Sequence, residues 1–158
     1  MGVLSEATYI HTAVNRGIAR IQGQLFRARR ARDDGDHFFE ELSRVEPIAK
    51  DIAQLLETFY ARERDELFPR AMRIFGGEVE EVKRLMRLQL STLAKLDQFR
   101  DELKERIEAQ RPGHPVRLAY LELLFEEFRD VFDERREVER LFYQTCSTLL
   151  YPGGVSTD

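Results

Sequence analysis

The spacing of apolar residues constrains this fold more than any other feature, because they recur at steps of three and four along almost the whole chain. This period places them on one face of an α-helix. No stretch alternates apolar and polar residues for long enough to predict a β-strand. Glycine and proline gather in the segments 33–36, 76–77 and 111–115, which separate the periodic segments. The chain is therefore expected to be all-α.

The three breaks divide the sequence into four predicted helices, at roughly 5–32, 37–75, 78–110 and 115–150. Within the second, Pro47 marks either the true helix start or a kink after a short turn. Short connections between long helices force neighbours to run antiparallel. Residues 1–158 are thus predicted to form one domain, an antiparallel up-down-up-down four-helix bundle, with a flexible tail at 152–158.

Charge and cysteine content narrow the possible functions. The net charge is −4, and no aromatic residues interleave with the arginine-rich segment 27–32. Neither nucleic acid nor an anionic membrane is therefore expected as a partner. No apolar run approaches the roughly 18 residues that span a bilayer. Cys146 is the only cysteine, which excludes an internal disulfide and favours a reducing compartment, so a cytoplasmic location is expected.

Each predicted helix carries one polar residue on its apolar stripe: His11, Glu63, Gln89 and Arg135. Counting residues from the shared turns, at about 1.5 Å of rise per residue, places all four at one level within roughly two turns. A buried charge without a partner costs several kcal/mol, so the four side chains are expected to satisfy one another. The sequence therefore predicts a central polar layer in which Arg135 pairs with Glu63.

The second predicted helix contains the run Phe-Tyr-Ala-Arg-Glu-Arg-Asp-Glu-Leu-Phe-Pro at residues 59–69. It resembles the second-helix signature of hemerythrin-like, cation-binding domains, which reads roughly His-Phe-x-x-Glu-Glu-x-x-Leu-Phe-Pro. His11 matches an early inward histidine of that family, and the segment 131–136 follows its fourth-helix run. The resemblance implies a hemerythrin-like four-helix bundle. In that family, the histidine and the first glutamate of the signature bind a two-iron site.

The departures from that signature fall on the iron ligands. Only His11 and Glu63 remain as plausible ligands, while other side chains stand at the remaining positions: Phe59, Gln89 or Leu90, Val131 and Arg135. Arginine has no lone pair to donate, and its charge repels a metal ion in the same cavity. The sequence therefore favours a bundle in which the guanidinium of Arg135 supplies the positive charge that a metal ion would supply.

The expected function is a non-enzymatic binding or regulatory module with a degenerate metal site and no cofactor. Its partner is an unidentified protein or small molecule. An alternative is a divergent non-haem iron protein that binds or senses oxygen, peroxide or nitric oxide. In that alternative, the helical wheel turns Asp133 and Glu137 away from the core, and the ligands are His11, Tyr60, Glu63 and Glu134. An enzyme that uses His11 as an acid or base is a third possibility.

Two further features leave alternatives open. His37 and Glu41 are four residues apart, a spacing that suits metal ligands, but a solvated helix start also explains them. Phe125 and Phe132 lie off the main stripe of the last predicted helix. They are expected to contact neighbouring helices, to form a homodimer interface or to line a small ligand pocket.

Overall fold

The computed structural model describes residues 2–77, 79–109 and 115–150, and they contain helices but no β-strand. The all-α prediction is confirmed. The expected tail at 152–158 lies outside the described residues. The elements are α1 (Val3–Arg30), α2 (Gly35–Ser43), α3 (Val45–Arg62), the π-helical segment η1 (Glu63–Leu67), α4 (Phe68–Phe75), α5 (Glu80–Ala109) and α6 (Pro115–Leu150).

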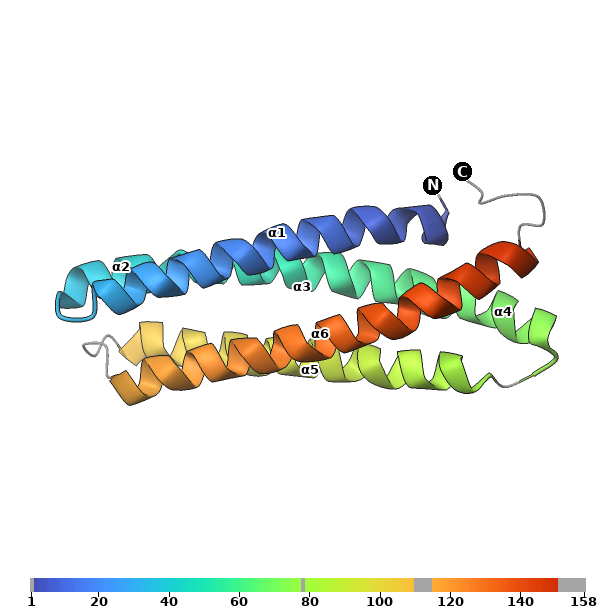
Figure 1. The fold of residues 1–158 in the computed structure, drawn as a ribbon. Coiled ribbons are helices and arrows are strands. Elements are labelled where there is room, and N and C mark those ends of the chain that lie inside the picture. Colours follow the sequence, from blue (N-terminus) through green and yellow to red (C-terminus); the bar gives the residue numbers. More distant parts are fainter. Residues whose placement is uncertain (1, 78, 110–114, 151–158) are drawn as a thin grey trace.

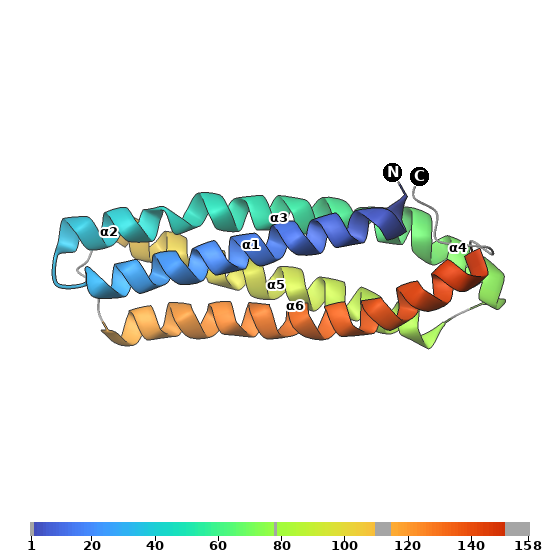
Figure 2. The ribbon, with the colours of Figure 1, turned by 45° about the horizontal axis from the view of Figure 1, so that its top comes forward.

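The helices lie lengthwise along one another (Figures 1 and 2). The elements from α2 to α4 follow one another along a single line, which runs antiparallel to α1. Helix α5 returns along the molecule and α6 runs back again. Helix α1 packs against α3 and α6, and α5 packs against the same two helices. The core therefore lies between α1, the line from α2 to α4, α5 and α6.

The second predicted helix, 37–75, is wrong as one continuous element, because the structure divides it twice. The first break, at Arg44, follows from Pro47, which lacks an N–H group and whose ring clashes with the carbonyl of Ser43 in a continuous helix. The second is η1, where the N–H of Phe68 bonds to the carbonyl of Glu63, five residues earlier. Pro69 follows at once, and the wider turn accommodates its missing donor.

The other helix boundaries differ little from the predicted ones. Helix α1 begins at Val3 rather than residue 5 and ends at Arg30 rather than residue 32. Its last turn is rich in arginine, which complements the negative end of the helix dipole. Gly76 ends α4 in the left-handed conformation, with φ of 80°, which glycine adopts without steric cost.

The core contains aliphatic side chains from every line of helices, together with a set of aromatic rings. Phe125 and Phe132 belong to it, since both are almost fully buried, so contact with neighbouring helices explains them. Helices α1 and α3 approach closely at Gly17, where a Cβ atom would lie 2.8 Å from the side chain of Ile52. No helix within the described ranges is both long enough and apolar enough to cross a membrane.

Candidate functional site: a buried ionic network around Arg135

The guanidinium of Arg135 lies at the centre of the molecule, with its side chain only 2% exposed. One terminal nitrogen, Nη2, donates a hydrogen bond to Oε1 of Glu63. The other, Nη1, lies 3.0 Å from Oε1 of Glu139. The flat face of the guanidinium lies 4.2 Å from the centroid of the Tyr60 ring, a cation–π contact. Two carboxylates and one aromatic face thus surround a single buried cation.

Glu63 is fully buried and accepts hydrogen bonds from three side chains. Besides Arg135, the donors are Nε2 of Gln89, at 3.0 Å, and the hydroxyl of Tyr143. Gln89 also donates to the backbone carbonyl of Tyr60, at 3.3 Å, which fixes its amide group. These contacts join η1, α5 and α6 at one level, so Glu63 holds three elements together.

The backbone at Glu63 is itself unusual, because this residue opens the π-helical segment. A π-helical turn widens the helix and rotates the residues that follow it relative to those before it. Such turns are rare and recur at functional sites. Here the wide turn separates the stripe of α3, which ends near Phe59 and Tyr60, from the stripe that continues at Leu67.

Glu139 extends the network toward the surface. It lies one helical turn after Arg135, on the same face of α6, and its Oε2 is 2.6 Å from Nε2 of His11. The His11 ring is held edge-on between Phe59 and Phe132, with centroid distances of 6.4 and 6.0 Å. The His11 side chain is 16% exposed and Glu139 only 1%, so the network meets solvent at His11 and at the partly buried Tyr143.

The pKa values of the two carboxyl groups move in opposite directions. Burial raises the pKa of Glu63 to about 8, against the lowering effect of Arg135. Burial acts on Glu139 too, but Arg135 and the hydrogen bond from His11 outweigh it and hold its pKa at about 2. Burial also raises the pKa of Tyr143 well above its usual value, and the negative charge of Glu63 adds to this.

These shifts have one electrostatic cause, which is that two buried carboxylates share one guanidinium. Burial disfavours the charge of Arg135, yet the attraction of Glu63 keeps its pKa above the ordinary value. One proton on the pair Glu63 and Glu139 leaves the buried group neutral, the least costly state in a medium of low dielectric constant. The network is therefore suited to hold and exchange a proton.

The structure brings three of the four residues of the predicted polar layer, Glu63, Gln89 and Arg135, into direct contact. His11 joins them through Glu139, which the sequence reasoning missed together with Tyr143. A signal for Glu139 existed, because the buried residues of α6 follow steps of three and four through it: Phe125, Phe128, Phe132, Arg135, Glu139, Phe142 and Cys146.

The predicted alternative iron ligands do not come together. The Glu134 side chain is 53% exposed and lies 3.5 Å from Arg84 on the surface, so it does not join the other three. Tyr60 presents its ring to Arg135. Among the described residues, no group of three or more His, Cys, Asp or Glu side chains is arranged to hold a metal ion. With a guanidinium between Glu63 and Glu139, the residues present do not fit a two-iron centre.

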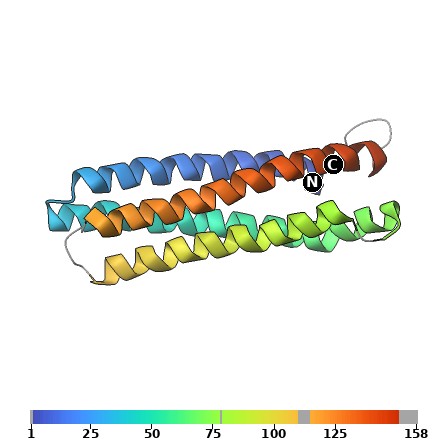
Figure 3. The ribbon, with the colours of Figure 1, turned by 60° about the horizontal axis from the view of Figure 1, so that its bottom comes forward.

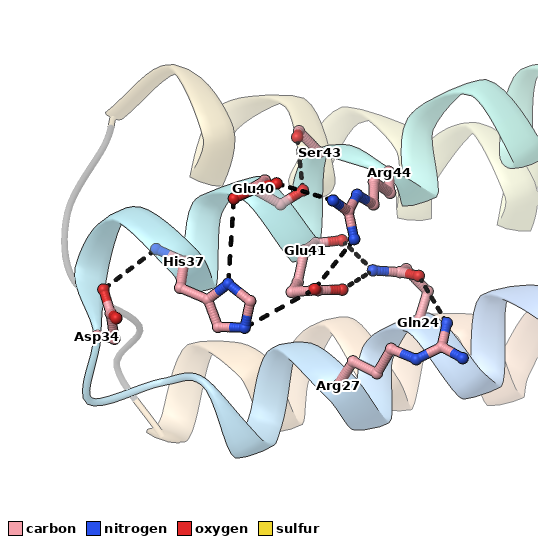
Figure 4. Close-up of polar contacts among 8 residues, drawn as sticks. All are labelled: Gln24, Arg27, Asp34, His37, Glu40, Glu41, Ser43 and Arg44. Atoms are coloured by element: carbon pink, nitrogen blue, oxygen red, sulfur yellow. Dashed lines mark hydrogen bonds and ion pairs between the residues drawn. The ribbon is translucent and has the colours of Figure 1, made fainter.

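A second polar cluster ties α2 to α1 (Figure 4). Nε2 of Gln24 donates to the backbone carbonyl of Glu41, at 2.8 Å, and to its carboxylate. Arg44 donates to the same carboxylate at 3.0 Å, and Nε2 of His37 lies 3.8 Å from it. His37 is 53% exposed, which agrees with a solvated helix start. Glu41 is buried, so a solvated helix start is the wrong explanation for this residue. Each polar group here has a structural partner.

Comparisons with protein-family models, with curated proteins and with solved structures gave no match to this chain. The hemerythrin-like resemblance of the segment 59–69 therefore stays a prediction.

Proposed function

We propose that this chain is an antiparallel four-helix bundle of the hemerythrin type in which Arg135 replaces the metal. In this proposal the domain works as a non-enzymatic binding or regulatory module. The observation that carries it is the position of Arg135, buried between Glu63 and Glu139 at the level where the family signature places its ligands. The guanidinium supplies the positive charge that the two carboxylates need.

The network also supports a binding role better than a catalytic one. Gln89, Tyr143 and Glu139 are each held by Arg135 or Glu63. Among the described residues, the buried hydroxyl of Tyr60 has no hydrogen-bond partner. Cys146 is buried and burial raises its pKa to about 12, so it is a poor nucleophile. A network of this kind responds to protons or to a partner that alters its charge.

The test is metal analysis combined with an optical spectrum, on protein produced with and without added iron. We expect far less than one iron atom per chain and no charge-transfer band. The matched sample is the double variant Arg135→His with Phe59→His, which adds two histidine donors beside Glu63. Near-stoichiometric iron in the unchanged protein, with a charge-transfer band, would overturn the proposal and favour the iron-sensing alternative.

A further inference from the structure

A groove of about 550 Å³ lies between the first turns of α1 and the C-terminal part of α6. Its apolar side is formed by Leu4 and Ala7, and His11 lies in its wall. Two arginines, Arg136 and Arg140, line it from α6, and both side chains are exposed. The groove is thus the place where the buried network opens to solvent through His11.

Positive charge dominates this groove, although the whole chain carries −4. Among the described residues that line it, the one acidic side chain is Glu139, whose two oxygens already face Arg135 and His11. Arg140 pairs with Glu137 at 2.7 Å, but both side chains are more than half exposed, so the pair contributes little and can exchange. Among the described residues, no carboxylate pairs with Arg136. Neither guanidinium that faces the groove therefore has a buried carboxylate among the described residues as its partner.

His11 presents a second ring nitrogen for a ligand. Its Nε2 is bound to Glu139, and its ring is fixed between Phe59 and Phe132. Within the described part of the chain, Nδ1 makes no hydrogen bond, nor is it among the buried polar atoms that lack one. A protonated His11 therefore donates from Nδ1 while Nε2 stays on Glu139.

We propose that this groove binds a small organic anion, a carboxylate on a short apolar body. The carboxylate lies against Arg136 and Arg140, while the apolar body covers Leu4 and Ala7. This inference rests on the proposed function in one respect. It requires Nε2 of His11 to face Glu139 rather than a metal ion.

The experiment titrates the full chain with benzoate, and with benzamide as the neutral molecule of the same shape. Isothermal titration calorimetry measures the affinity of each molecule. We expect benzoate to bind at least about tenfold more tightly than benzamide, since each charge-assisted hydrogen bond contributes about that factor.

Variants test whether Arg136 and Arg140 bind the benzoate. The double variant Arg136→Gln with Arg140→Gln should weaken benzoate binding about tenfold or more. The control, Arg84→Gln with Arg87→Gln, removes the same charge from exposed positions of α5, outside the groove, and should change it less than about twofold.

Two results would overturn the inference. They are equal binding of benzoate and benzamide, or equal effects of the two arginine pairs. The iron content of the same sample separates this inference from the proposed function. Iron-free protein that does not bind benzoate contradicts the groove alone, whereas protein that contains stoichiometric iron contradicts the proposed function.

Discussion

Replacing Arg135 by methionine tests the central electrostatic argument. The substitution keeps an unbranched side chain of similar length but removes the cation between Glu63 and Glu139, whose side chains are 0% and 1% exposed. Breaking a buried pair by removing one partner costs about 3–5 kcal/mol, because the remaining charge stays buried. Out of a total stability of about 5–15 kcal/mol, this is a large loss.

The assay is equilibrium unfolding in urea at pH 8, with thermal unfolding as a second measurement. For a chain of this size the loss corresponds to a fall in Tm of about 6–20 °C, at about 2–4 °C per kcal/mol. The control is Arg84→Met, which breaks an ion pair with Glu134 in which both side chains are 53% exposed. Such an exposed pair contributes less than about 1 kcal/mol.

A rescue variant separates charge from packing. Adding Glu63→Gln and Glu139→Gln to Arg135→Met removes both stranded carboxylates and should recover most of the lost stability, since neutral replacement of a buried ionic group is often tolerated. The deficit of Arg135→Met alone should also shrink at pH 5, where the two carboxyl groups can take up protons. If Arg135→Met unfolds within about 1 kcal/mol of the unchanged protein at pH 8, the network is not held by this cation.

Two further predictions concern the pH profile and helix packing. Because the folded-state pKa of Glu63 is about 8 and its ordinary value is 4.5, the contribution of Glu63 to stability is fully present below pH 4.5 and falls by up to about 1.4 kcal/mol per pH unit between these values. Glu63→Gln should remove that slope in urea unfolding at several pH values. Glu139, with its pKa at about 2, loses its contribution only as the pH falls below 4.5, so Glu139→Gln should be costly at neutral pH. Gly17→Ala should lower Tm, because its Cβ would clash with Ile52, whereas Gly23→Ala, with nothing within 4 Å, should raise stability by about 0.5–1 kcal/mol.

The helical class was predictable because it depends on a local pattern that persists across each segment. The interruptions inside the second predicted helix were harder to foresee. Pro47 pointed to one of them, since the clash of a proline ring with the carbonyl four residues earlier is a local effect. The π-helical segment at Glu63 shifts the pattern by a single residue, and the apolar stripe on either side still reads as helical. A shift this small is visible only in the backbone hydrogen bonds.

The sequence predicted the height of the site along the helices, but not all of the residues that form it. Counting residues from the turns placed Glu63, Gln89 and Arg135 together, because helical rise is constant. Val138 and Glu139 both satisfy a step of three or four from Arg135, so that single step could not choose between them. The structure buries the glutamate and leaves the valine half-buried. The longer series of steps, through Phe132, Arg135 and Phe142, is the pattern that favours Glu139.

An arginine at this position changes what the core of the proposed module can sense. A metal centre responds to molecules that bind the metal, whereas a guanidinium between two carboxylates responds to protons. The path for that response is short, since Arg135 contacts Glu139 and Glu139 contacts His11. His11 and Glu139 both line the groove. A ligand in the groove therefore reaches the buried charge at Glu139 itself and through the hydrogen bond between Nε2 of His11 and Glu139.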